Sequence, residues 1–191
     1  KYYLGEAYLS INDKPNALKY HTLVVEEQKS TYMERSMRRV GDLLYAQEKY
    51  RPAINAYQLL ASITKSSRNQ IKAWEGLMNT YYELKKLDSA RYFANEIITK
   101  SNSELAKNKA MLYVAQSYYD QNDYTKALPL FKKVSESAKD RSGAIALYSY
   151  GHVLYNQGLY KESLDALFRL NKEFPMDDDL RGKNFLLIAD N

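Results

Sequence analysis

A tyrosine returns at a nearly fixed interval along this chain. Tyr45, Tyr82, Tyr119 and Tyr155 are separated by 37, 37 and 36 residues. A repeat of this length is typical of proteins in which each unit buries its apolar face only against its neighbours. The period therefore predicts an array of about five short repeats within the 191 residues, rather than one globular domain.

Each repeat contains two apolar stretches with helical spacing, separated by a short polar break. Residues three and four apart share one face of a helix, so the apolar positions form a stripe. Breaks at 12–15 and 121–123 contain Asn, Asp and Pro, which favour turns and helix starts. Pro129 lies inside one predicted helix and is expected to bend it. The predicted helices span 1–11, 14–28, 32–47, 50–64, 69–84, 87–99, 104–120, 124–137, 141–156, 160–173 and 178–190.

Composition excludes several classes of function. Cysteine is absent, which rules out disulfides, zinc ribbons and thiol chemistry. The net charge of +5 comes from mixed signs along the chain, without the block of like charge that a nucleic-acid-binding arm needs. No apolar run approaches the roughly 18 residues of a membrane span. We therefore expect no nucleic-acid partner and no membrane span in this fragment.

Constellations that perform catalysis are also missing. The two histidines, His21 and His152, are far apart in the sequence and lack a neighbouring nucleophile or metal-ligand spacing. No Gly-rich phosphate loop occurs. The prediction is a protein that is not an enzyme and has no catalytic residues, no metal and no cofactor.

The chain resembles the tetratricopeptide repeat (TPR) family over essentially its whole length. Trp74, Tyr81 and Ala90 follow the family pattern in the third repeat. The period of 36–37 residues departs from the family's usual value of about 34, and Met78 stands where Gly is usual. The fifth repeat matches best, through Tyr150, Gly151, Leu154, Gly158, Tyr160, Ser163, Leu167, Leu170 and a closing Pro175.

The resemblance implies an all-α, right-handed α-solenoid of about five helix-turn-helix hairpins plus one extra C-terminal helix. A single array would cover residues 1–191. Its units would span 1–30, 31–66, 68–102, 104–139 and 141–176, with the extra helix at 178–190. That last helix leaves an apolar face open, so we expect more protein to follow it.

The resemblance also implies that the first helix of each hairpin lines a concave surface. Tyrosine gives a large contact area there, and amides can hold an extended backbone. The alternative is that these tyrosines are half-buried packing residues whose hydroxyls reach water. The candidate ligand-binding residues are Arg38, Tyr45, Asn79, Tyr82, Gln116, Tyr119, Tyr148, His152 and Tyr155.

Two charged clusters each have two interpretations. Arg35, Arg38 and Arg39 could clamp a carboxylate or phosphate, or form a solvated surface, which is the commoner case. The run at 177–179 could hold a cation, but we favour a cap for the final helix.

A receptor for the C-terminal tails of heat-shock chaperones is not expected. Some TPR proteins hold such tails with a two-carboxylate clamp, and Arg38 and Lys109 fit its basic positions. Asp42, Gly76 and Tyr113 do not fit, because the clamp has Asn, Asn and Arg there.

The leading functional prediction is a protein-interaction scaffold that binds a peptide or partner segment along a concave, Tyr-lined groove. The alternative is a structural spacer that self-associates through Phe185, Leu187 and the Tyr2–Tyr3 edge. The style of the repeats also resembles long multi-repeat proteins of the Bacteroidetes cell envelope. That resemblance favours a periplasmic or cell-envelope location over the cytoplasm.

Overall fold

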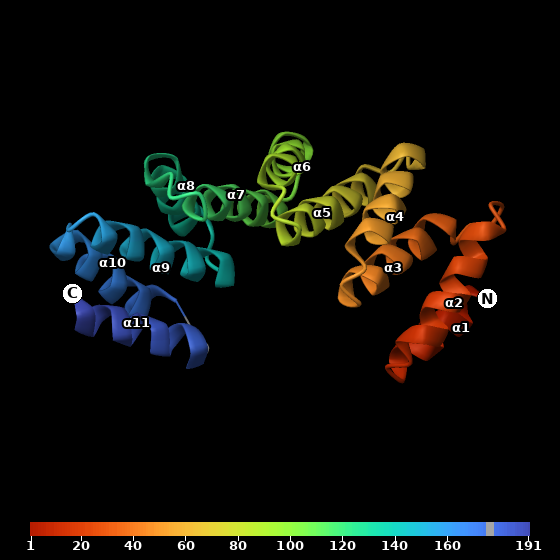
Figure 1. The fold of residues 1–191 in the computed structure, drawn as a ribbon, viewed down its shortest axis with the longest axis horizontal. Coiled ribbons are helices and arrows are strands. Elements are labelled where there is room, and N and C mark those ends of the chain that lie inside the picture. Colours follow the sequence, from red (N-terminus) through yellow and green to blue (C-terminus); the bar gives the residue numbers. More distant parts are fainter. Residues whose placement is uncertain (175–177) are drawn as a thin grey trace. The chain divides into compact units, whose positions relative to one another are not determined.

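The structure, a computed structural model, describes residues 1–174 and 178–191. Every regular element in these residues is a helix (Figure 1). The all-α helical-repeat fold predicted from the sequence is thus confirmed. The helices are α1 (Tyr2–Ser10), α2 (Lys14–Glu26), α3 (Met33–Ala46), α4 (Tyr50–Ile63), α5 (Ser67–Glu83), α6 (Leu87–Lys100), α7 (Glu104–Tyr119), α8 (Tyr124–Ser137), α9 (Arg141–Asn156), α10 (Tyr160–Glu173) and α11 (Asp178–Asp190).

The predicted helix ends agree with the observed ones to within two residues. Side-chain caps explain much of this agreement, because an Asp or Ser before a helix accepts a hydrogen bond from an otherwise unpaired backbone N–H. Asp13 accepts from the Asn16 amide at 3.1 Å, and Asp123 accepts from the Lys126 amide at 3.3 Å. Ser66, Ser103 and Asp140 cap α5, α7 and α9 in the same way.

The turn inside each hairpin has one residue in the left-handed region, and this residue follows the repeat period. Left-handed backbone favours Gly and Asn, since other side chains crowd the following carbonyl. Glu48 and Lys85 nevertheless adopt it, and backbone bonds of 2.9 Å from Lys49 N to the Leu44 carbonyl and from Lys86 N to the Tyr81 carbonyl close the two turns. The φ values are 59° at Asn12, 58° at Glu48, 57° at Lys85, 59° at Asn122 and 74° at Gly158.

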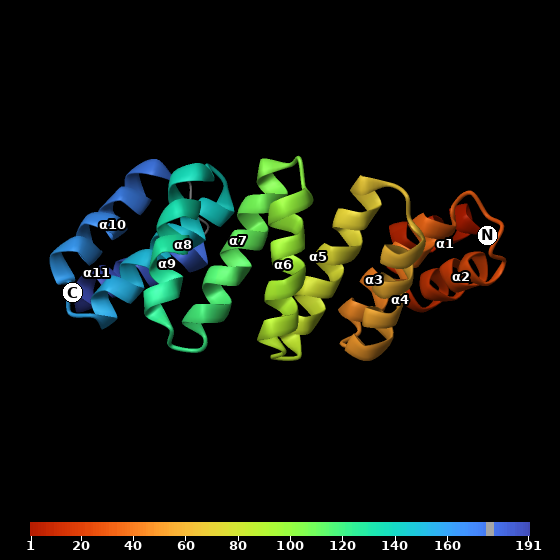
Figure 2. The same cartoon turned by 90° about the horizontal axis from the view of Figure 1, so that it is seen from above.

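Contacts divide the chain into two compact units, residues 1–97 and 98–191, with the boundary inside α6. In the first unit, helices adjacent in the sequence from α1 to α5 pack on one another, and α3 also contacts α5. The pairing of α1 with α2 is visible in Figure 2. Tyr81 on α5 stacks on Phe93 of α6 with ring centroids 5.7 Å apart.

The ring of Tyr57 on α4 explains why two positions in this unit are glycine. A Cβ at Gly41 would lie 2.5 Å from its ring, and a Cβ at Gly76 would lie 2.4 Å from it. The ring is therefore enclosed between α3 and α5, where only glycine leaves room. Met78, which occupies the repeat position of Gly41, is itself buried. The close approach of α5 to α4 thus takes place at Gly76, two residues before the position that the repeat alignment indicates.

The second unit packs α7, α8 and α9 around Phe131, and α9, α10 and α11 around Leu147 and Leu170. Helix α8 continues through Pro129, which lies on its exposed side. On α11 the buried Asn184 donates from Nδ2 to the Leu167 carbonyl at 3.2 Å. This bond, together with the burial of Leu180 and Leu187, fixes α11 against α10.

None of the helices in the described part of the chain has the length and apolar character needed to cross a membrane.

Candidate functional site

Most of the predicted ligand-binding residues line one of two cavities, and each cavity lies within a single unit. Arg38, Tyr45 and Asn79 line a cavity of about 260 Å³ in the first unit, which we call the Asn79 cavity. Four others line a cavity of about 410 Å³ in the second unit, which we call the Tyr119 cavity. They are Gln116, Tyr119, Tyr148 and His152.

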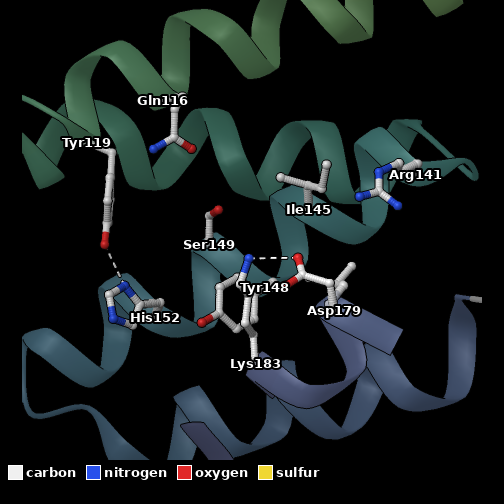
Figure 3. Close-up of a pocket in the computed structure, with 10 residues that line it drawn as sticks. Gln116, Tyr119, Arg141, Ile145, Tyr148, Ser149, His152, Asp179 and Lys183 are labelled. Atoms are coloured by element: carbon white, nitrogen blue, oxygen red, sulfur yellow. Dashed lines mark hydrogen bonds and ion pairs between the residues drawn. The ribbon is translucent and has the colours of Figure 1, made fainter. Parts of the chain in front are cut away.

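The first helices of successive hairpins build the Tyr119 cavity. Helix α7 supplies Gln116 and Tyr119, which are three residues apart and so share a face. Helix α9 supplies Tyr148 and His152, spaced by four residues for the same reason. Figure 3 shows the four side chains together with those from α11. The remaining lining residues are Arg141, Ile145, Ser149, Asp179, Leu180 and Lys183.

A hydrogen bond and a ring stack fix the aromatic wall of the Tyr119 cavity. The Tyr119 hydroxyl lies 2.6 Å from His152 Nδ1, and either atom can be the donor (Figure 3). The Tyr148 ring lies parallel to the imidazole, with centroids 6.2 Å apart and planes inclined by 6°. Gln116 donates from Nε2 to Asp120 Oδ1 at 3.0 Å, one turn along α7. These contacts hold the side chains of the wall in one arrangement.

The wall is uncharged near neutral pH. Burial lowers the pKa of His152, because a desolvated imidazolium is unfavourable. Burial also raises the pKa of the Tyr119 hydroxyl, and the neighbouring Tyr124, Tyr148 and Asp120 raise it further. The pKa of Tyr148 is raised by burial as well. The wall therefore offers neutral donors and acceptors next to aromatic carbon.

Charged side chains stand at the edge of the Tyr119 cavity, and sequence reasoning missed them as site residues. Lys183 Nζ pairs with Asp179 Oδ2 at 2.7 Å along α11, and Arg141 begins α9 (Figure 3). The acidic run at 177–179 was expected to cap the last helix. Asp177 lies outside the described residues, whereas Asp179 is part of the cavity.

The Asn79 cavity is more polar and lies between α3 and α5. The buried Tyr57 hydroxyl donates to Asp42 Oδ1 at 2.8 Å, and Lys72 Nζ pairs with Glu75 Oε2 at 2.6 Å. Burial first, and the Asp42 carboxylate second, raise the pKa of Tyr57, so its phenol keeps its proton. The cavity thus combines a fixed phenol, a carboxylate and an ion pair with the amide of Asn79.

Two of the predicted residues line neither cavity. Lys85 Nζ lies over the Tyr82 ring, 5.3 Å from its centroid. The Tyr155 ring meets the edge of Tyr160 at 5.6 Å. Both tyrosines are half-buried, as the packing interpretation expects.

The remaining histidine belongs to a structural cluster. His21 is fully buried, with Nδ1 3.3 Å from Ser36 Oγ and Nε2 3.4 Å from Glu6 Oε1. Arg39 clamps the same Glu6 through two hydrogen bonds of 2.8 Å, so its guanidinium group is already paired. Across residues 1–174 and 178–191, no group of three His, Asp or Glu side chains could hold a metal ion.

A family model for subunit 3 of the anaphase-promoting complex, cyclosome, matches residues 89–170. This stretch is less than half of the chain. No curated protein matches the chain in sequence.

Solved structures resemble the chain over most of its length. A tetratricopeptide repeat protein from Parabacteroides merdae has a TM-score of 0.76 at 19% identity, covering 97% of this chain and 70% of that one. MamA has a TM-score of 0.76 at 14% identity, covering 89% and 94%. YrrB, described as a TPR protein with an unusual peptide-binding site, has a TM-score of 0.62 at 17% identity, covering 88% and 82%. The chain therefore shares the helical-repeat fold of TPR proteins.

Proposed function

We propose that the chain is a protein-interaction scaffold in which the Tyr119 cavity and the Asn79 cavity each bind an extended segment of a partner protein. The observation that carries this proposal is the repetition of the cavity-lining positions. Asn79, Gln116 and His152 follow one another at intervals of 37 and 36 residues, and all three line a cavity. Polar groups repeated along the first helices of successive hairpins suit a ligand that is itself a chain.

The chemistry of the Tyr119 cavity supports a peptide ligand. Tyr119 and Tyr148 offer rigid aromatic area, and aromatic anchors of this kind carry much of the free energy of protein recognition. Gln116 and His152 add neutral groups that can exchange hydrogen bonds with a peptide backbone. Because Tyr119 and His152 already bind each other, little side-chain entropy is lost on binding. YrrB, which has a similar fold and is described as having an unusual peptide-binding site, supports a peptide as the ligand.

The test is a selection from a phage-displayed library of random peptides, followed by affinity measurements with the enriched peptides. We expect Tyr148→Ala and His152→Ala each to weaken binding by about tenfold or more. Tyr92→Ala is the matched control, because Tyr92 is an exposed tyrosine of α6 that lines neither cavity. Circular dichroism verifies that each variant is folded. Equal affinity in all four proteins would contradict the proposal.

A structural spacer that self-associates is the second candidate, and exposed apolar side chains favour it. Phe185 is 55% exposed on α11 and Tyr3 is 71% exposed on α1. Leu187 was predicted to be a contact as well, but it is buried against the core, and the exposed leucine of α11 is Leu186, at 69%. Analytical ultracentrifugation over a range of concentrations tests this candidate. It predicts a mass that rises with concentration in the wild type and stays monomeric in Phe185→Glu. A monomer at all concentrations would exclude it. A cell-envelope location remains a prediction from the style of the repeats.

A further inference from the structure

Half of the residues that line a second cavity in the first unit are cationic. It measures about 440 Å³ and lies beside the first turns of α3 and α5. We call it the arginine cavity. Its lining comprises Arg35, Arg38, Arg68 and Lys72, with Glu34 as the one carboxylate and Tyr2, Ser66 and Asn69 as neutral neighbours.

The repeat period brings these cations together. Arg35 on α3 and Lys72 on α5 are 37 residues apart, so they occupy the same position of successive repeats. Arg38 lies one turn after Arg35, and Arg68 lies one turn before Lys72. Helices α3 and α5 contact each other, which places both pairs at a shared boundary.

Three of the four cations form no ion pair in the described part of the chain. Lys72 pairs with Glu75 at 2.6 Å. Glu34 bonds to neutral groups and to none of these cations: Oε2 accepts from Asn69 Nδ2 at 2.6 Å and from Thr64 Oγ1 at 2.7 Å. Within residues 1–174 and 178–191, the guanidinium groups of Arg35, Arg38 and Arg68 form no ion pair. Arg38 is also half-buried, so its charge is only partly solvated.

We propose that the arginine cavity binds the anionic side chains of an acidic protein segment, through Arg35, Arg38 and Arg68. This inference rests on the proposed function and specifies the chemistry of the partner. Guanidinium groups present planar pairs of N–H donors that match the oxygens of a carboxylate or a phosphate. The bound anion would supply the ion-pair partner that the three arginines lack among the described residues.

The neighbouring cavity favours a protein segment over a nucleic acid. Arg38 and Lys72 line both the arginine cavity and the Asn79 cavity, so the two adjoin. The Asn79 cavity contains the carboxylates of Asp42 and Glu75, which would repel a strand with a charge on every nucleotide. A peptide can place an acidic residue in one cavity and a neutral or basic residue in the next.

The aromatic group in the arginine cavity also favours a protein segment over a nucleic acid. The Tyr2 ring is stacked on Tyr32, with centroids 4.4 Å apart and planes inclined by 9°. One face of the ring is therefore already covered, whereas proteins that bind single strands offer open aromatic faces to successive bases.

The experiment uses fluorescein-labelled synthetic peptides of Gly and Ser with glutamate, phosphoserine or glutamine at the same positions, and a single-stranded oligothymidylate of similar length. Fluorescence anisotropy at a fixed salt concentration measures the affinity of the 191-residue chain for each probe. We expect at least one acidic peptide to bind about tenfold or more tightly than the glutamine peptide. The tighter of the glutamate and phosphoserine peptides identifies the source of the anion. Tighter binding of oligothymidylate than of both acidic peptides would overturn the proposal.

Two double variants, each of which removes two positive charges, test whether the acidic peptide binds at the arginine cavity. Arg38→Gln combined with Arg68→Gln should lower the affinity for the acidic peptide by about tenfold or more. Lys49→Gln combined with Arg51→Gln removes the same amount of charge from exposed positions outside the cavity, and should change the affinity by less than about threefold. Equal losses in the two double variants would also overturn the proposal. If the peptides selected for the Tyr119 cavity still bind and depend on Tyr148, the proposed function stands while this inference fails.

Discussion

The Tyr119 hydroxyl lies 2.6 Å from His152 Nδ1, and this contact joins two first helices, α7 and α9. The two residues are 33 positions apart in the chain. They meet because each lies on the same face of its own hairpin, and successive hairpins pack with that face in common. The repeat thus brings together the two side chains that form the cavity wall.

Both histidines should titrate below the ordinary value of 6.5 in the folded protein. Burial lowers the pKa of His21 and of His152; for His21, Glu6 raises the pKa and Arg39 lowers it. The folded state therefore binds fewer protons than the unfolded state just below pH 6.5. The free energy of unfolding should accordingly decrease as the pH falls below this value.

NMR titration of the imidazole Cε1 protons measures the two pKa values directly, because the chain has only two histidines. The spectrum of His152→Gln assigns them. Urea unfolding at successive pH values then tests the sign of the linkage. An ordinary or raised pKa at the fully buried His21 would contradict the role assigned to burial.

The ring and the hydroxyl of Tyr57 should contribute separately to stability. Tyr57→Phe keeps the ring between Gly41 and Gly76 and loses only the bond to Asp42, so we expect a loss of about 1–2 kcal/mol. Tyr57→Ala also removes the buried ring and should cost about 3–5 kcal/mol. Thermal or urea unfolding of both variants measures the two losses. Similar losses in both would show that the ring contributes little.

Two glycines should respond to the same substitution with opposite signs. A Cβ at Gly158 or Gly182 would meet no atom within 4 Å, so packing is unaffected in both cases. Gly158 has φ of 74°, and Gly158→Ala should lose about 1 kcal/mol through backbone strain. Gly182 lies inside α11, and Gly182→Ala should gain about 0.5–1 kcal/mol. The midpoints of urea unfolding give both signs. Changes of the same sign would contradict this interpretation.

The repeat period and the apolar pattern were enough to predict the helices, because the spacing of apolar residues along the chain indicates a helix without any distant contact. Side-chain caps such as Asp13 and Asp123 could also be predicted, since they act within a few residues. The role of Gly76 could not be predicted, because it depends on Tyr57 from the preceding hairpin. Glu48 and Lys85 in left-handed turns have no signal of their own, and only their place in the period indicates them.

Part of the candidate site was also predicted, because some of its residues recur with the repeat period. Gln116 and Tyr148 were predicted as site residues because their positions recur with the period on the first helices, and both line the Tyr119 cavity. Asp179 and Lys183 enter the Tyr119 cavity from α11, outside the five full repeats, so the period could not place them. Arg39 looked equivalent to Arg38 in the sequence, but Glu6, 33 residues earlier, binds it. Which member of a charged cluster is left without a partner depends on such distant contacts.

The most direct test of peptide recognition uses the two histidines as internal reporters. A peptide from the selection is titrated into the protein while the imidazole Cε1 protons are followed by NMR at a pH where both rings are neutral. We expect the His152 signal to shift in proportion to the bound fraction, while the signal of His21, buried beside Gly5 and Ser36, stays in place. Saturable binding that leaves the His152 signal unmoved would contradict it.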